Sequence, residues 1–413
     1  MTTSTLDPAR TVAELKELRA LTGDEDGAQR VAWTDVWRRT LDWYREKLAA
    51  LPVEVITDPA GNTWATLRGA SERSLLIGGH LDSVPNGGWL DGCLNVLAGL
   101  EVLRRIAADG TPPVTVRLVN WADEEGARFG RSLFGSSAFS GTLDPEDIAD
   151  LKDRDGIAWP EALKAFDVDL YTAKLATAQQ QHAAAYLELH IEQGPVLEDM
   201  GLPMGVVLGT FGVERNAITF LGQAAHAGST PMHKRRDAFA AAAKLGLEIR
   251  EIAKRHGGVC TLGSCVTKPG IVTAVVGEAT VALDQRHMDA GELAAMLQEA
   301  KDASQRFAAE EQCEVAWSPI WRIEPIPFDP GLIELADEAI RETCGTSHRL
   351  PSGPLHDAAE VARAGIPTVM LFVQSLRGIS HNKIEDTLEE HLELSVQALD
   401  KLASKAMALI AKG

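Results

Sequence analysis

The chain has 413 residues, of which 45% are hydrophobic and 5% aromatic, and its formal net charge is −19 at pH 7. This length exceeds one typical domain and can bury a large core, so we expect two domains. The acidic balance disfavours nucleic acid and anionic membrane surfaces as partners, and no apolar run approaches membrane-spanning length.

The N-terminal part of the chain alternates predicted helices and strands, beginning with an amphipathic helix near residues 37–48. Residues 74–79 predict a strand that runs into His80, and an apolar-periodic helix starts just after Asp91. His80 and Asp91 therefore bracket a glycine-rich loop at the end of a strand. Open α/β sheets place their active sites at such strand ends.

A second predicted strand, residues 114–119, ends at three acidic residues. Asp123, Glu124 and Glu125 follow this largely buried strand. An isolated acidic triplet is more often a solvated loop, but adjacent carboxylates repel each other unless a cation or a shared proton compensates them. The triplet favours a metal site because other strand ends carry matching residues.

Two further strands carry one histidine each. The alternating segment 186–194 contains His190, and the strand 366–373 leads to His381. Imidazole and carboxylate ligands from several strand ends suit Zn, Mn, Ni or Co. Any one of these histidines would more often be an ordinary structural residue, but four strand-end sites together strongly favour a metal centre.

The order of predicted elements changes between about residues 208 and 320. Strands and helices there follow the order βαββαβ, the split unit in which two helices cover one face of an antiparallel sheet. We therefore predict an α/β catalytic domain over residues 1–207 and 323–413, interrupted by an inserted domain over residues 208–322.

The cysteines indicate a reducing compartment. They form neither a paired framework nor a zinc-finger spacing, and they are Cys93, Cys260, Cys265, Cys313 and Cys344. The first residues, Met1–Pro8, lack the charged-then-apolar pattern of an export signal. We therefore expect a cytoplasmic protein.

Over nearly its whole length the sequence resembles the M20 metallopeptidase family, and specifically its hydantoinase/carbamoylase branch. The motifs that carry the resemblance lie at residues 27–34, 58–62, 79–84, 87–92, 124–130, 190–194, 225–232 and 380–381. The resemblance implies a mixed-sheet, zinc-peptidase-like catalytic domain with an inserted α+β, ferredoxin-like domain. In the family this inserted domain is a lid and also the interface of a homodimer.

The resemblance also implies a centre of two divalent ions, with Zn, Mn, Co or Ni as candidates. His80 and His190 would bind one ion, Glu125 and His381 would bind the other, and Asp91 would bridge them.

Further roles follow from the same resemblance. Glu124 would be the general base that takes a proton from the attacking water, and Asp82 would fix a ligating imidazole. His226 would stabilise the oxyanion, in the family often from the partner subunit. Arg286 would pair with the substrate α-carboxylate, and Gln193 would contact its ureido or carboxylate group. Without the resemblance, His226 is better explained as a loop cap and Arg286 as part of a surface salt bridge.

Positions expected around the substrate depart from the family pattern. Thr273 stands where the family commonly has an Asn that binds the carboxylate, and the segments 352–357 and 373–375 also differ. No predicted metal ligand is lost. Thr273 therefore remains a candidate substrate-binding residue, and the particular substrate stays open.

The sequence thus predicts a dinuclear metal-dependent hydrolase of a linear non-peptide amide in a small molecule that bears a carboxylate. The leading candidate is an N-carbamoyl-L-amino acid, cleaved to the amino acid, CO2 and ammonia. Allantoate, N-carbamoyl-β-alanine and other N-acyl amino acids are alternatives within the family. An M20 dipeptidase or aminoacylase fits the motif at 124–129 poorly. A non-catalytic interaction protein would have lost the base or some ligands.

Overall fold

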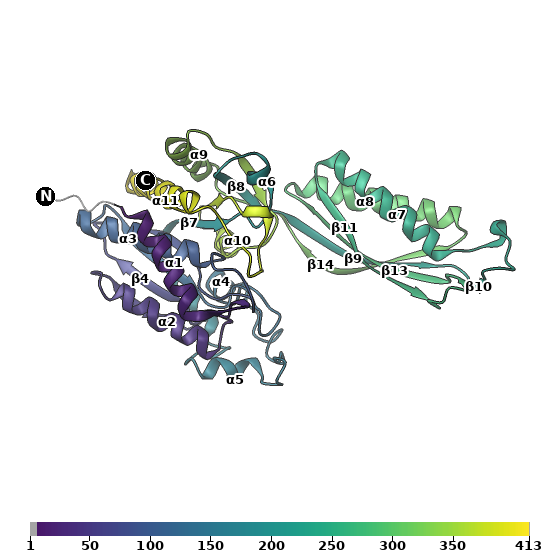
Figure 1. The fold of residues 1–413 in the computed structure, drawn as a ribbon, viewed down its shortest axis with the longest axis horizontal. Helices are drawn as coiled ribbons and strands as arrows, with labels where there is room; N and C mark the ends of the chain where they lie inside the picture. Colours follow the sequence, from purple (N-terminus) through teal and green to yellow (C-terminus); the bar gives the residue numbers. More distant parts are fainter. Residues whose placement is uncertain (1–5, 413) are drawn as a thin grey trace. The chain divides into compact units, whose positions relative to one another are not determined.

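The computed structural model describes residues 6–412, which form two compact units of mixed α/β structure (Figure 1). The core unit comprises residues 6–208 and 328–412, and the inserted unit comprises Gly209–Pro327. The predicted boundary at residue 322 falls inside strand β14 (Glu314–Ile323), so the inserted unit extends further than predicted. Residues 1–5, which contributed to the prediction about an export signal, lie outside the described residues.

The core unit is built on a nine-stranded mixed sheet in the order β15-β8-β17-β7-β5-β6-β4-β3, with β16 beside β8; the two-residue edge strand β15 and the end of β8 belong to the segment Gly209–Pro327. Its strands are β3 (Glu54–Thr57), β4 (Thr63–Leu67), β5 (Ser74–His80), β6 (Thr115–Trp121), β7 (Ala183–Ile191), β8 (Met204–Thr210), β15 (Ile326–Pro327), β16 (Arg349–Ser352) and β17 (Thr368–Val373). A separate short hairpin pairs β1 (Gly23–Asp24) with β2 (Gly27–Ala28).

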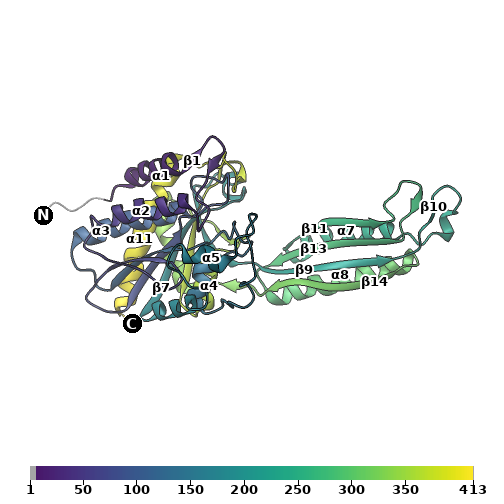
Figure 2. The same cartoon turned by 90° about the horizontal axis from the view of Figure 1, so that it is seen from below.

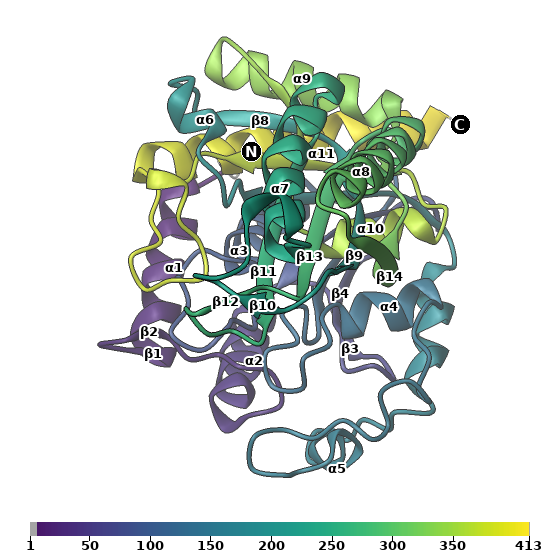
Figure 3. The ribbon, with the colours of Figure 1, turned by 90° about the vertical axis from the view of Figure 1, so that its right-hand side faces the viewer.

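Helices cover both faces of this sheet, which makes its central strands almost wholly buried. Figure 3 shows α9 and α11 side by side on one face, and α4 and α10 on the other. The helices of the core unit are α1 (Pro8–Thr22), α2 (Asp35–Leu48), α3 (Cys93–Asp109), α4 (Phe134–Ser140), α5 (Trp159–Lys164), α6 (Val196–Asp199), α9 (Pro330–Cys344), α10 (Asp357–Arg363) and α11 (Glu389–Lys412), with 3-10 turns η1 (Ala173–Gln180) and η3 (Leu376–Gly378).

Four parallel strands position the candidate site. β5 pairs in parallel with β6 and β7, and β7 pairs in parallel with β17. Because the carboxyl ends of parallel strands meet at one edge of a sheet, the residues that end or follow these strands are brought together. These are the four strands that the sequence assigned to His80, to the acidic triplet, to His190 and to the segment before His381.

The first helix of the chain is α1, which the sequence pattern does not predict. The pattern places the first helix near residues 37–48. The Asp7 carboxylate caps α1 by accepting the N–H of Arg10, and the helix buries Val12, Leu15 and Leu18. Its apolar face is narrow, so its periodicity in the sequence is weak. No helix in the described part of the chain combines the length and apolar character needed to cross a bilayer.

The inserted unit has a four-stranded antiparallel sheet in the order β11-β13-β9-β14. The helices α7 and α8 lie along one face of it (Figure 2) and bury its apolar side chains. In chain order the elements are β9 (Gly212–Leu221), β10 (Ala225–His226), η2 (Met232–Lys234), α7 (Ala238–His256), β11 (Val259–Lys268), β12 (Ala274–Val275), β13 (Glu278–His287), α8 (Ala290–Glu310) and β14. The main elements therefore follow the order βαββαβ.

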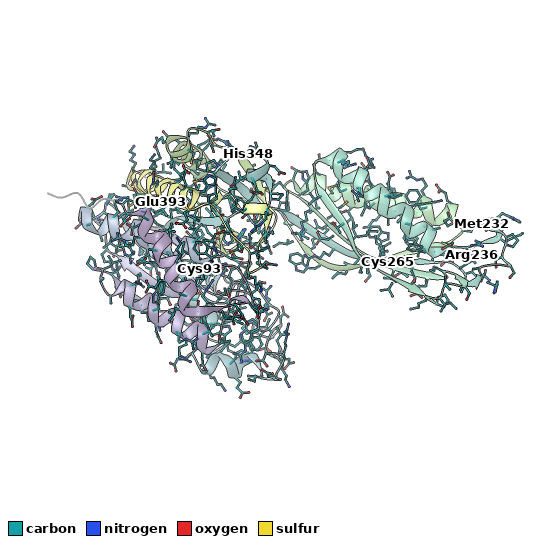
Figure 4. All side chains as sticks on the ribbon, in the orientation of Figure 1. Cys93, Met232, Arg236, Cys265, His348 and Glu393 are labelled. Carbon is teal, nitrogen blue, oxygen red and sulfur yellow. The ribbon has the colours of Figure 1, made fainter. Side chains whose placement is uncertain are left out.

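All five cysteines are free thiols. Cys93 is buried at the start of α3 in the core unit, whereas Cys265 is exposed on β11 (Figure 4). Neither belongs to the groups of residues that could hold a metal ion among the described residues.

A histidine joins the two helices of the inserted unit. His256, the last residue of α7, contacts Glu292 of α8 through Nδ1 at 2.6 Å and Glu299 through Nε2 at 2.9 Å. The hydrogen bonds to Glu292 and Glu299 raise the pKa of His256 above its ordinary value. Because both ring nitrogens face carboxylates, the protonated imidazolium is the form that fits this position.

We expect His256→Gln to destabilise the inserted unit in a pH-dependent manner. A pKa that is higher in the folded state than the unfolded value of about 6.5 stabilises the fold fully below that value, and the stabilisation is lost as the pH rises through the folded pKa. The Tm deficit of the variant should therefore be larger at about pH 6 than at about pH 9. Calorimetry at both pH values measures the Tm deficit. An equal deficit at the two pH values would show that the contacts of protonated His256 with Glu292 and Glu299 do not stabilise the unit.

Candidate active site

The core unit brings the five predicted ligands together in two groups that share Asp91. One group contains His80, Asp91 and His190, and the other contains Asp91, Glu125 and His381. Within each group the potential ligand atoms lie within 4.8 Å of one another. This division is the one that the resemblance implied.

The two oxygens of the Asp91 carboxylate face different groups. Its Oδ1 lies 3.1 Å from Nε2 of His190 and 3.8 Å from Nε2 of His80. Its Oδ2 lies 3.2 Å from Nε2 of His381. A carboxylate that offers one oxygen to each of two ligand groups is the arrangement that a pair of cations requires of a bridge.

Hydrogen bonds set the tautomers of the two buried histidines. Nδ1 of His80 lies 3.1 Å from the backbone oxygen of Asp82, and Nδ1 of His190 lies 2.8 Å from that of Ile191. A carbonyl oxygen only accepts, so each Nδ1 must carry a proton, and Nε2 is the ring atom that faces Asp91. This is the orientation that a metal-binding imidazole adopts when its other nitrogen is bonded to the protein.

The turn that presents Asp91 depends on the glycine after it. Gly92 has φ of +64°, in the left-handed region, and precedes the first turn of α3. A Cβ at this position would lie 2.3 Å from the ring of His80. Any side chain here would displace a candidate ligand, so the loop between His80 and Asp91 tolerates only glycine at its end.

The neighbours Glu124 and Glu125 face different groups. Oε2 of Glu124 lies 3.7 Å from Nε2 of His80, and Oε2 of Glu125 lies 3.4 Å from Nε2 of His381. The Asp82 carboxylate accepts the backbone N–H groups of both residues, at 3.2 and 3.1 Å, and lies 3.6 Å from Nδ1 of His80. Asp82, predicted only to fix an imidazole, therefore also orients the acidic pair.

Burial and mutual repulsion shape the charge of the site. Burial raises the pKa of Glu124 well above its ordinary value, and burial together with Asp91 raises the pKa of Glu125 to about 7. Burial also opposes ionisation of Asp91, but hydrogen bonds from His190 and His381 hold the pKa of Asp91 well below its ordinary value. Buried carboxylates at this density need cations, which is the fit expected of a metal centre.

The third acidic residue, Asp123, does not belong to either group. Its carboxylate accepts the indole N–H of Trp33, and both residues have left-handed backbones, with φ of 57° and 63°. Backbone strain of this kind clusters at functional sites. The hydrogen bond between Asp123 and Trp33 fixes the backbone just before Glu124. Asp123 therefore helps to position the adjacent Glu124 and Glu125.

Glu385 is a member of the site that the sequence did not indicate. Its Oε1 accepts the backbone N–H groups of Leu90 and Asp91, both at 3.1 Å, and its Oε2 accepts the hydroxyl of Ser380 at 2.8 Å. A Cβ on Gly88 would lie 1.9 Å from Oε1 of Glu385. The only feature of the sequence that could have indicated Glu385 is its position four residues after His381. The loop around it has no regular periodicity.

Gln193, predicted to contact the substrate, lies against the bridging carboxylate. Its Nε2 donates to Oδ2 of Asp91 and to Oγ of Ser380, both at 3.0 Å. Its backbone is also left-handed, with φ of 57°. Beside this cluster, a recess of about 300 Å³ is lined by Asp26, Pro85, Asn86, His381, Asn382 and Lys383.

The remaining predicted residues belong to the inserted unit, where His226 and Thr273 are neighbours. His226 on β10 pairs with Ala274 on β12, and the Thr273 carbonyl accepts the N–H of Ala227 at 2.8 Å. Nδ1 of His226 accepts the N–H groups of Gly228 and Ser229, at 3.1 and 3.2 Å. The neutral ring therefore carries its proton on Nε2, and the exposed side chain offers an N–H donor.

Arg286 lies on β13 in the four-stranded sheet, whereas β10 and β12 form a separate two-stranded sheet. It pairs with Val213 near the end of β13, whereas Thr273 precedes the start of that strand at Glu278. At roughly 3.3 Å per residue, the part of β13 from Glu278 to Arg286 alone separates them by ~26 Å. One inserted unit therefore cannot bring both Thr273 and Arg286 to a single small carboxylate.

Known proteins are similar to this chain over most of its length. The family model for peptidase family M20/M25/M40 matches residues 76–405. The chain is 34% identical to the N-carbamoyl-L-amino acid amidohydrolase of Geobacillus stearothermophilus, covering 90% of this chain and 92% of that protein. It is 33% identical to the allantoate amidohydrolase of Escherichia coli strain K12, covering 90% of this chain and 91% of that protein.

Solved structures agree in fold over nearly the whole chain. The crystal structure of a hydantoinase/carbamoylase family amidase from Burkholderia multivorans matches with a TM-score of 0.88 and 32% identity, covering 97% of this chain and 98% of that one. A second amidase of that family, from Burkholderia ambifaria, matches with a TM-score of 0.87 and 33% identity, covering 99% of this chain and 97% of that one.

We expect the two adjacent glutamates to give different phenotypes. Glu124→Gln should lower kcat by about 10²–10⁴-fold with metal content near that of the wild type, because the proton acceptor is lost and the ligand set remains. Glu125→Gln should instead lower the occupancy of one ion. Elemental analysis of the purified variants, alongside steady-state kinetics, separates these effects. Equal metal loss in both variants would show that the two roles are wrongly assigned.

Proposed function

Since the chain belongs to peptidase family M20/M25/M40 and is an amidohydrolase acting on non-peptide C–N bonds, we propose that its substrate is an N-carbamoyl-L-amino acid. The observation that carries this proposal is the pair of ligand groups sharing Asp91, with the buried Glu124 beside one of them. The product would be the free amino acid, with CO2 and ammonia from the carbamoyl group.

The donor set fits two divalent ions. His80 and His190 would hold one ion, Glu125 and His381 would hold the other, and Asp91 would serve both. Zn, Mn, Co or Ni bound there would polarise the substrate carbonyl and lower the pKa of water. Asp82, Gln193 and Glu385 keep the ligands in place through the hydrogen bonds described above.

Glu124 would move the proton. It has a carboxylate oxygen beside the first ligand group, and its raised pKa favours taking a proton from the attacking water and returning it to the leaving nitrogen. The nitrogen leaves as the amine of the amino acid, and the remaining carbamate breaks down to CO2 and ammonia. Neighbouring carboxylates thus divide the work, since one binds metal while the other stays free to carry the proton.

The inserted unit would act as a lid and as the interface of a homodimer. Nε2–H of His226 is an exposed donor suited to the oxyanion that forms when water attacks the carbonyl. The guanidinium of Arg286 suits the substrate α-carboxylate. Because the length of β13 separates Arg286 from the small sheet of β10 and β12, we assign His226 and Thr273 to one subunit and Arg286 to the other at each site.

A second candidate substrate is allantoate. The allantoate amidohydrolase of Escherichia coli is as similar to this chain as the N-carbamoyl-L-amino acid amidohydrolase is, at 33% against 34% identity. N-Carbamoyl-β-alanine and other N-acyl amino acids belong to the same chemical class.

Free cysteines throughout the chain favour a cytoplasmic location for this chemistry.

A substrate panel tests the proposal. The protein, stripped of metal and then supplied with Mn, Co, Ni or Zn, should release ammonia and amine from N-carbamoyl-L-amino acids. The rates should exceed those with N-formyl and N-acetyl amino acids and with allantoate. Preference for allantoate would replace the leading substrate with the second candidate, and full activity in a verified metal-free preparation would exclude the mechanism.

We expect two inactive variants to restore activity when combined in one dimer. A dimer of Glu124→Gln and His226→Ala subunits holds one site with both Glu124 and an intact partner His226. Random pairing should thus give about a quarter of wild-type activity after co-refolding. Each variant refolded alone is the control. If the mixture stays inactive although mixed dimers form, His226 acts within its own subunit.

A further inference from the structure

Two arginines of the inserted unit share a single carboxylate. Asp284 on β13 lies opposite Arg215 on β9. Nε of Arg215 donates to Oδ2 of Asp284 at 2.7 Å, and Nε of Arg286 donates to Oδ1 at 2.8 Å. Two cations around one anion leave a local positive charge, in a chain whose net charge is −19.

Packing holds the Arg215 guanidinium in a fixed plane. Its central carbon lies 5.1 Å from the ring centroid of Trp321, the residue paired with it on β14. Stacking on an indole together with a bonded Nε restricts a guanidinium without using its outer nitrogens. Within residues 6–412, Nε makes the only hydrogen bond that the guanidinium of Arg215 donates, and the side chain is 43% exposed. Its Nη groups are therefore available to an incoming anion.

The negative charge of Asp284 does not neutralise the positive charges of both arginines. Burial opposes the ionisation of Asp284, but hydrogen bonds from Arg286 and Arg215 lower its pKa, so it stays charged and balances one of the two cations. The side chain of Thr261, which lies opposite Asp284 on β11, adds a hydroxyl and no further charge.

We propose that Arg215 forms a second anion-binding subsite one carboxylate away from Arg286, and that the preferred substrates carry an acidic side chain. The proposal rests on the proposed function, in which Arg286 binds the α-carboxylate. A second carboxylate in the same small molecule then lies within reach of the Nη groups of Arg215. The substrate class is N-carbamoyl-L-aspartate and N-carbamoyl-L-glutamate, dicarboxylates that a pair of planar guanidinium groups recognises.

The test compares each acid with its amide of nearly identical shape. Wild-type protein should show kcat/KM for N-carbamoyl-L-aspartate about tenfold or more above that for N-carbamoyl-L-asparagine, and likewise for the glutamate and glutamine pair. Arg215→Gln should bring the acids down to the level of their amides, with the amides changed by about twofold or less. Arg215→Lys, which keeps the charge, should retain part of the preference.

Arg306→Gln is the matched control. Arg306 is an exposed arginine of α8 stacked over Phe307 at 4.6 Å, and it has no contact with Asp284. This variant should keep the full preference for acids. Circular dichroism and thermal unfolding of all three variants establish that they are folded.

Three results would overturn the proposal. A wild-type enzyme that hydrolyses N-carbamoyl-L-alanine and the amides as fast as the acids would lack the second subsite, while the proposed function would stand. An equal loss for acids and amides in folded Arg215→Gln would show that Arg215 only supports Arg286. Absence of hydrolysis for every N-carbamoyl amino acid, with allantoate or another amide cleaved, would overturn the proposed substrate as well.

Discussion

The site depends on the burial of negative charge around Asp91. The core unit encloses carboxyl groups that would be costly to bury without compensation, among them Asp82, Asp91, Asp123, Glu124, Glu188, Asp357 and Glu385. Three nearby histidines face these carboxylates, and hydrogen bonds from His190 and His381 lower the pKa of Asp91, but the buried carboxylates outnumber the histidines. Divalent ions bound by the two ligand groups would neutralise this excess of negative charge. Without ions, the buried carboxylates are expected to have raised pKa values.

The fold meets this requirement through strand topology. β5, β6, β7 and β17 are adjacent, parallel and buried on both faces, so residues beyond their carboxyl ends converge from distant parts of the chain. Close backbone approach completes the convergence, because Gly92 and Gly88 leave room for the His80 ring and the Glu385 carboxylate. The inserted unit has its own core and sheet, which lets it carry His226 and the Arg215–Asp284–Arg286 cluster as rigid groups.

Much of the core site could be predicted from the sequence because its residues directly follow apolar runs. His80, the acidic triplet and His190 lie in or just beyond such strands, and strand ends are where open sheets bind ligands. Glu385 could not be found this way, because it lies in an irregular loop and acts on backbone groups far away in sequence. The separation of Thr273 from Arg286 was also hidden, since it depends on strand order and register. The narrow apolar face of α1 concealed that helix.

Anomalous diffraction from crystals grown with Mn or Zn would locate the ions of the proposed metal centre. Data collected on both sides of the metal absorption edge should show two peaks roughly 3.5–4 Å apart, one on either side of the Asp91 carboxylate. His80 and His190 should flank the first peak, and Glu125 and His381 the second. A single peak at saturating metal, or peaks away from Asp91, would contradict the dinuclear centre on which the proposed chemistry rests.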